Sequence, residues 1–250
     1  MIAIFALAAC KKDGATEQKP PAASRLTQVA YDFGTMDIAY APDGTLKSTI
    51  TSNGGSEVER AEFRYTGNKV ATVTTPDLLY QYEYTADRLT AIDVSFVSGG
   101  RAGRYELVYN GNVLAERIQY AWNTVQRQMV PFRKLVYTFS PAGNVIKTRL
   151  LVYLFGGWSG AGEVVSYEYD NKPNPVSHLE GKPFLPQNML MKNNPVKAVH
   201  ETALGDTTKT VEHAYTYNSS SQALVRTTKV TTKNGQGSGT SAASFRYDSY

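Results

Sequence analysis

The sequence has one cysteine, little charge and no run of basic residues. Cys10 is the only thiol in 250 residues, so a disulfide within the chain and a metal site built from cysteines are both excluded. Charged residues make up 19% of the chain, and the formal net charge of +4 is spread without a cationic block. Long-range attraction for a polyanion is therefore weak, and we expect no nucleic-acid partner.

The sequence also lacks an assembled catalytic or metal-binding motif. Its three histidines, His178, His200 and His213, fit no metal-ligand spacing. Ser159 lies in GGWSGAG, which departs from a nucleophile elbow because Ala161 replaces the second glycine, and we expect a loop there. We therefore predict no catalytic residue, no metal and no cofactor.

The cysteine lies at the end of an apolar N-terminal run. Residues 2–9 are almost wholly apolar and finish in Leu-Ala-Ala, small residues of the kind that precede a signal-peptidase cut. The stretch 7–10 resembles the lipobox of bacterial lipoproteins, in which the cysteine is acylated and becomes the mature N-terminus. The resemblance implies a signal peptide at 1–9, an acylated Cys10 and the lipid bilayer as a partner. No positive charge precedes Cys10, which fits a true start further upstream.

A polar segment follows the cysteine. Residues 11–28 carry no apolar period, so we predict that 10–28 form a lipidated flexible tether. Lys11 stands where an aspartate would resemble an inner-membrane retention signal, which favours the outer membrane. The periplasmic and the surface face of that membrane both stay open, because KKDG matches the acidic export signal of Bacteroidota surface lipoproteins poorly.

Aromatic residues followed by tight turns recur along the rest of the chain. Tyrosine (17) outnumbers phenylalanine (9) and tryptophan (2), which suits strands with one dry and one wet face. The last aromatic before each turn serves as an anchor, and the anchors are Tyr40, Tyr65, Tyr84, Tyr109, Phe139, Tyr169, Tyr217 and Tyr247. They lie 25, 19, 25, 30, 30, 48 and 30 residues apart, so each unit is one hairpin with loops of variable length.

The turns themselves carry hairpin chemistry. Two of them, 42–44 and 141–143, begin with proline and end with glycine, and a third contains Asn-Gly at 110–111. Proline presets the first turn position, and glycine tolerates the positive φ that such turns require. We predict positive φ at Gly44, Gly111 and Gly143.

One strand shows the alternation of faces most clearly. Tyr80, Tyr82 and Tyr84 point to one side, while Gln81 and Glu83 point to the other. We interpret the tyrosine stripe as the buried face of a sheet, and a stacking platform for a sugar or a base is the functional alternative.

The connections at the opposite strand ends are longer and rich in glycine, and one of them holds Trp158. Binding residues tend to lie on such loops. We expect a glycan or a peptide as the ligand, and the residues predicted to face it are Tyr80, Tyr82, Tyr84 and Trp158.

The hairpins predict one all-β domain over 29–250, present as a monomer. An antiparallel meander of about 14 to 16 strands exceeds what an open twisted sheet usually holds, so it should curl into a large curved sheet or a barrel-like wrap. Few segments have the length and the apolar outer side that a membrane-spanning strand needs, so a spanning barrel is not favoured.

The hairpin rhythm fails in the long gap before Tyr217. Five of the eleven prolines fall within 173–195, and proline cannot donate to a sheet ladder, so no central strand is expected there. We assign an insertion at 171–199 that plugs the concave face or one open end of the sheet, with Phe184 and Leu190 against its tyrosine-rich side. A mobile lid over a ligand groove is the alternative.

The phrase YEYDNKPNPV at 167–176 and the repeated Y-x-Y…G-N-V hairpins carry a family resemblance. They resemble YD/RHS-type repeats and, related to these, Bacteroidota lipoproteins of unknown function with a porin-like fold. The likeness covers about residues 30–250, although only YDNK and YDSY keep the Tyr-Asp pair. It implies a lipid-anchored β-meander without known activity or catalytic residues.

Two functions are consistent with the sequence. The first is a non-catalytic binding or scaffold lipoprotein anchored in the outer membrane, and the absence of an assembled acid, base or nucleophile favours it. The second is a glycan-processing enzyme whose two carboxylates, about 5 to 9 Å apart, would meet in a groove of the folded sheet.

Overall fold

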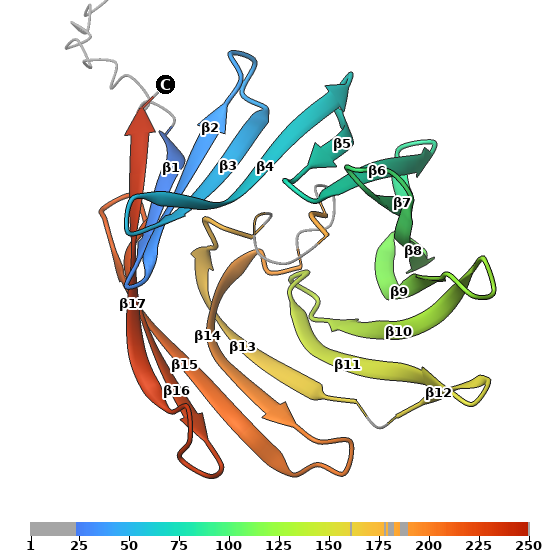
Figure 1. Ribbon diagram of the computed structural model, residues 1–250. Helices are drawn as coiled ribbons and strands as arrows, with labels where there is room; N and C mark the ends of the chain where they lie inside the picture. The colour runs from blue at the N-terminus through green and yellow to red at the C-terminus, as the bar shows by residue number, and fades with distance from the viewer. Residues whose placement is uncertain (1–23, 161, 178, 180–182, 186–189, 250) are drawn as a thin grey trace, which may run out of the picture.

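The chain forms a single antiparallel β-sheet of 17 strands (Figure 1). In this computed structural model, the structure describes residues 24–160, 162–177, 179, 183–185 and 190–249. Among these residues there is no helix, and hence none suited to crossing a membrane.

The strands follow one another as a meander. The first nine are β1 (Ser24–Tyr31), β2 (Gly34–Tyr40), β3 (Leu46–Asn53), β4 (Ser56–Thr66), β5 (Lys69–Thr74), β6 (Leu78–Thr85), β7 (Arg88–Phe96), β8 (Arg101–Asn110) and β9 (Val113–Asn123). The others are β10 (Gln128–Phe139), β11 (Val145–Leu154), β12 (Gly157–Ser159), β13 (Val164–Pro173), β14 (Asn193–Glu201), β15 (Thr207–Tyr217), β16 (Ala223–Thr232) and β17 (Gly239–Ser249).

The sheet closes on itself as a barrel. β1 pairs with β2 through Val29 and Met36, and with β17 through Val29 and Phe245, so the first and last strands meet. β12 is a three-residue spur beside β11, which also pairs directly with β13, so 16 strands form the wall. The all-β meander is thus confirmed, and of the two expected forms the closed barrel is the one adopted, because closure leaves no exposed sheet edge.

The N-terminal boundary of the barrel differs from the expected one. β1 begins at Ser24, so 24–28, which we assigned to the tether, form sheet. Val29 is fully buried and Leu26 is 5% exposed, so the strand is held by its inward side chains although the preceding residues are polar. Residues 1–23, with the expected signal peptide and Cys10, lie outside the described part of the chain.

The tight turns have the predicted backbone. Gly44 has φ of 89°, Gly111 of 58° and Gly143 of 83°, which confirms the three glycine predictions. The ladder shifts register by one residue beside most of these turns, for example at Tyr40, Tyr109 and Phe139. Each turn is therefore joined to a β-bulge, which twists the strands and helps the sheet to curve.

The anchor tyrosines link neighbouring hairpins. Four of them donate a hydroxyl hydrogen bond to a buried carbonyl oxygen in an earlier strand: Tyr40 to Leu26 (3.0 Å), Tyr109 to Leu89 (2.8 Å), Tyr169 to Val145 (2.5 Å) and Tyr247 to Ala223 (3.0 Å). Three of the acceptors follow a tight turn directly or by one residue. The recurrence of an aromatic before each turn thus has a structural cause, because the hydroxyl satisfies a buried backbone acceptor in the preceding unit.

The two faces of the barrel wall have opposite character. Buried apolar and aromatic side chains line the inside and form two adjoining clusters, one around Leu89 and Ile92 and the other around Val29 and Phe245. The outside carries ion pairs distributed around the wall: Arg60–Glu62, Arg104–Glu83, Lys134–Glu116, Lys197–Glu168 and Arg246–Asp248. The interior therefore holds the hydrophobic core, and the exterior holds these ion pairs.

The proline-rich insertion lies inside the barrel and is shorter than expected. β13 continues to Pro173 and β14 begins at Asn193, so the connection runs from 174 to 192, and the assignment of 171–199 was too long. Pro195 does lie in a strand, contrary to the expectation. The ladder shifts register beside it, so the absence of a backbone N–H at Pro195 does not interrupt a regular run of hydrogen bonds. In Figure 1 the described residues of this connection lie within the ring of strands.

The described residues of the insertion pack as a plug. Val176 and Leu185 are buried, and Phe184 and Leu190 contact the cluster that contains Tyr80 and Tyr82, as predicted. The Phe184 ring meets the edge of Phe63 at 4.9 Å between centroids.

The exit of the plug is clamped to the β10–β11 turn. The Asn144 side chain donates to Asn193 Oδ1 (2.8 Å) and accepts from the Asn193 backbone N–H (2.9 Å), and the Val145 N–H donates to the Leu190 carbonyl (2.8 Å). Asn144 is 4% exposed, so these bonds are shielded from water.

Candidate functional site

The tyrosine stripe of β6 faces the plug. Tyr80 and Tyr82 are each 8% exposed, and Tyr84 is half-buried beside them. The Tyr82 hydroxyl donates to the Phe184 carbonyl oxygen at 2.9 Å. Burial raises the pKa of Tyr82 above its ordinary value and that of Tyr84 to about 12, so both phenols are neutral at physiological pH. The stripe thus serves the core, as interpreted from the sequence.

A small cavity remains between this stripe and the plug. It has a volume of about 120 Å³ and is lined on the barrel side mainly by strands β2–β6 and on the other side by the plug. Phe63, Tyr80 and Phe184 supply aromatic surface, Glu59 supplies a carboxylate, and Thr51 supplies a hydroxyl. A cavity of this size could hold one small ring or a few waters.

A larger groove lies at the barrel end where the plug leaves. It has a volume of about 980 Å³ and runs between the β8–β9 and β10–β11 turns and the end of the plug. Its lining combines aromatic, amide, hydroxyl and ammonium groups: Asn110, Asn112, Tyr137, Thr138, Phe139, Ser140 and Lys192. Tyr137 is 8% exposed, and its hydroxyl has no hydrogen-bond partner among the described residues.

Trp158 lies apart from the tyrosine stripe. It belongs to β12 and pairs with Tyr153, whose ring meets the tryptophan edge-on at 5.2 Å. The ammonium of Lys134, which is bonded to Glu116 at 3.2 Å, lies 5.1 Å from the Trp158 ring. These partners belong to the outer face of the wall, so the structure does not bring the four predicted ligand-facing residues together. Ser159 ends this short strand and does not lie in a loop as expected, because the chain turns back along β11.

Several charged side chains inside the barrel were missed by the sequence reasoning. Arg117 pairs in register with the inward-facing Leu107 and Leu135, and its guanidinium lies 5.6 Å from the Tyr105 ring. A period-two pattern counted from Leu114 places Arg117 outside. The bulge after Leu114 shifts the alternation by one residue and turns Arg117 inward.

A second inward arginine lies across the barrel. Arg226 pairs with Tyr215 and Ala243 and stacks 5.9 Å from the Phe245 ring. Burial, with a smaller effect from Arg226, lowers the pKa of His213 to about 4, and His213 Nδ1 contacts the Thr228 hydroxyl at 2.9 Å. His213 is therefore neutral at physiological pH.

The described residues offer no metal centre. They contain no group of three or more histidine, cysteine, aspartate or glutamate side chains that could hold an ion. His200 contacts Glu163 Oε1 at 2.6 Å, and His213 lies in a different part of the wall. His178 lies outside the described residues.

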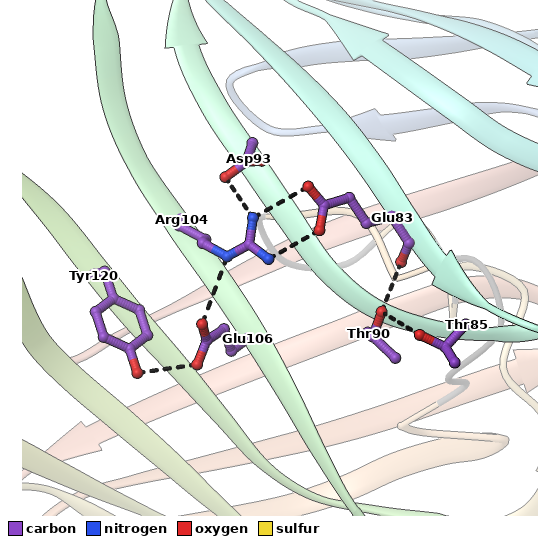
Figure 2. Close-up of polar contacts among 7 residues, drawn as sticks. All are labelled: Glu83, Thr85, Thr90, Asp93, Arg104, Glu106 and Tyr120. Carbon is purple, nitrogen blue, oxygen red and sulfur yellow. Dashed lines mark hydrogen bonds and ion pairs between the residues drawn. The ribbon is translucent and has the colours of Figure 1, made fainter. Parts of the chain in front are cut away.

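Three carboxylates lie on the outer wall around one arginine (Figure 2). Arg104 on β8 donates to both oxygens of Glu83 (3.2 and 2.8 Å) and to Asp93 (2.8 Å), and Glu106 lies 3.5 Å from its Nε. Tyr120 on β9 donates to the other oxygen of Glu106 at 3.0 Å.

This arrangement does not resemble a glycosidase acid and base. The bond from Arg104 holds the pKa of Glu83 below its usual range, whereas a general acid needs a raised pKa. The carboxylates are spread over three strands of an open wall, and none of the three lines the cavity beside the plug or the groove at the plug exit.

No family model and no curated protein sequence matches the chain. Several solved structures match it. A porin-like protein from Bacteroides vulgatus is 14% identical with a TM-score of 0.62, and the alignment covers 90% of this chain and 99% of that one. A porin-like protein from Bacteroides uniformis is 11% identical with a TM-score of 0.59, covering 90% and 95%.

A DUF3836 family protein from Parabacteroides distasonis also aligns, at 23% identity and a TM-score of 0.29, over 31% of this chain and 75% of that one. A similarity of that size supports no argument. The two longer alignments show that this chain has the porin-like barrel fold, and at such identities they show the fold alone.

Proposed function

We propose that the chain is a lipid-anchored envelope lipoprotein of the bacterial outer membrane, with a barrel that stands in water and a non-catalytic binding or scaffold role. The observation that carries this proposal is the polarity of the wall. The buried clusters inside the wall are apolar and aromatic, with Arg117 and Arg226 as inward charges, and ion pairs are distributed over the outside.

The polarity of the wall is the reverse of what a spanning barrel needs. A membrane barrel presents an apolar outer band about 25 Å tall, and a charge at mid-bilayer on the lipid face costs about 2 to 4 kcal/mol. Here the outer face of β4 carries Arg60, Glu62 and Arg64, and the Arg104 cluster lies in the middle of β6–β8. The plug also fills part of the interior that an open pore would need.

An acylated Cys10 supplies the attachment that such a barrel lacks. The barrel begins at Ser24, so 13 residues separate the cysteine from the first strand. Both chain ends leave from the same end of the barrel (Figure 1).

A mutant and fractionation test this proposal. Wild-type protein should take up radiolabelled palmitate and stay with membranes through an alkaline carbonate wash, whereas Cys10→Ala should take up no label and should be released by that wash without detergent. Cys10→Ala protein that is still extracted from membranes only by detergent would overturn the proposal, because the barrel itself would then hold the membrane.

The groove at the plug exit is the proposed ligand site, and the ligand class is a glycan or a peptide. Sugar sites combine aromatic faces with amide and hydroxyl groups, which Phe139, Asn112 and Ser140 provide here. A glycan and peptide array screened with residues 11–250 should give hits that Thr138→Val weakens. The matched control Thr72→Val, on the outer wall of β5, should leave them unchanged; equal effects of both variants would place the ligand elsewhere.

A further inference from the structure

The two ends of the barrel differ in the chemistry of their turns. At the end where β1 starts and β17 finishes, the turns are made of small and polar residues such as Gly67-Asn68 and Ala86-Asp87. At the opposite end, which we call the far end, five turns carry a large apolar side chain: Phe33, Val97, Val125, Phe155 and Leu204.

Three of these side chains project fully into solvent. Phe155 is 106% exposed, Leu204 is 92% and Val125 is 90%. They occupy the β11–β12, β14–β15 and β9–β10 turns, which lie in one sector of the meander; the first two project at the lower right of Figure 1. Single exposed apolar residues are common on protein surfaces, but these three lie on successive turns of one rim and are almost fully exposed, so together they give that rim a set of apolar tips.

We infer that the far end inserts these three side chains into the interfacial region of a lipid bilayer. Two of the tips are single apolar residues between polar or small neighbours, with Thr124 and Gln126 beside Val125 and Gly205 beside Leu204, and Phe155 follows Leu154, which is 46% exposed. None of the three lines the cavity beside the plug or the groove at its exit, so they form no part of either hollow that a partner's side chain could enter. A protein interface has a contiguous, well-packed centre, whereas a bilayer interface accepts separate shallow insertions.

The length of the tether is compatible with this contact. The 14 residue-to-residue steps from Cys10 to Ser24 span about 46 to 50 Å when extended. A strand of the length of β9 or β10, tilted as barrel strands are, rises only about 28 to 30 Å. The tether can therefore run along the wall and let the acyl chains and the far end enter the same bilayer. This inference does not depend on acylation, and it is tested with protein that carries no acyl chain.

The single cysteine of the natural sequence allows a site-specific test. Residues 11–250 contain no thiol, so Phe155→Cys can be labelled with an environment-sensitive fluorophore, as can Val113→Cys at the other end, where Val113 is 50% exposed. With vesicles of phosphatidylethanolamine and phosphatidylglycerol, the label at 155 should brighten and shift to the blue. The label at 113 should not respond.

Vesicle flotation supplies the second measurement. Phe155→Asp combined with Leu204→Asp should weaken vesicle binding at least tenfold, while Val113→Asp should leave it unchanged, and high salt should have little effect because the contact is apolar. Absence of vesicle binding by residues 11–250, an equal response of both labels, or an effect of the far-end variants on oligomeric state alone would overturn the inference. Failure here would leave the Cys10 result untouched, so the two proposals are separable.

Discussion

The hydrogen-bond and ion-pair partners of an individual residue in this barrel depend on the side of the wall that the residue occupies. A tyrosine inside the wall donates its hydroxyl to a backbone carbonyl, as Tyr109 does to Leu89. A glutamate outside the wall stays ionised beside an arginine, as Glu83 does beside Arg104. The same side chain on the other face would lose these partners, because buried polar groups need a hydrogen bond and buried charges need compensation.

His213 should make the stability of the barrel depend on pH. Its folded pKa of about 4 lies below the ordinary 6.5, so between these values the unfolded chain binds a proton that the folded chain does not. Stability should be full above about pH 6.5 and fall as the pH drops toward 4, by about 1 to 2 kcal/mol after allowance for the partial exposure of the ring. Urea unfolding of wild type and His213→Gln at pH 7 and 4.5 measures this, with His200→Gln as the control. An unchanged pH slope in His213→Gln would contradict the assignment.

Substitutions at Gly111 and Gly143 distinguish the stability cost of backbone strain from that of crowding. Gly111 has φ of 58° and open space where a Cβ would point, whereas a Cβ on Gly143 would lie 2.6 Å from Lys192 Nζ. Gly111→Val should cost about 1 to 2 kcal/mol through left-handed strain alone. Gly143→Val should cost at least as much and should also disturb the plug exit. A thermal shift within error for Gly111→Val would show that its turn relaxes to another type.

At the scale of elements, the hairpin is the repeating unit and the tyrosine bond joins one unit to the next. The turn, the bulge beside it and the anchor hydroxyl occur together, which explains why proline, glycine and tyrosine recur in phase. The plug is the exception, and it is fixed at its exit by Asn144 and Asn193 in place of strand pairing.

Removing one anchor hydroxyl should weaken the barrel. Tyr109→Phe deletes the bond to the Leu89 carbonyl and leaves that buried acceptor unpaired, so the free energy of unfolding should fall by about 1 to 2 kcal/mol. Tyr153→Phe, on the outer wall, is the matched control and should change it by less than about 0.5 kcal/mol. Equal effects in chemical denaturation would mean that the hydroxyl bond contributes nothing specific.

At the scale of the whole molecule, closure removes the edges of the sheet. β1 is bonded to both β2 and β17, so this one strand covers two edges that would otherwise be exposed. Fourteen or more strands without closure would present long unpaired edges, which are templates for aggregation. Closure therefore protects a sheet of this size from pairing edge to edge with another copy.

Deleting β1 should test closure directly. Residues 24–250 keep every strand and should remain monomeric in size-exclusion chromatography, with the far-ultraviolet circular dichroism of the longer chain. Residues 34–250 lack β1 and expose the edges of β2 and β17, so they should aggregate or form larger assemblies. A monomeric 34–250 protein with an unchanged spectrum would show that the meander is stable as an open sheet.

The sequence alone determined the class of fold, the tight turns and the inward side of many strands. Local chemistry suffices for these, because proline and glycine select the turn and alternation selects the face. It also placed the plug, since Phe184 and Leu190 are too apolar to remain in a solvated loop.

Only the tertiary structure decided closure, the bulge parity and the grouping of site residues. Closure depends on β1 meeting β17, more than two hundred residues away in the chain, which no local pattern encodes. Each bulge reverses the alternation beyond it, so Arg117 turns inward although its sequence position suggests the opposite. Trp158 and the β6 tyrosines lie on opposite faces of the wall. The face that a residue takes depends on the bulges and the spur that precede it in the chain, and bulges and spurs are properties of the folded sheet.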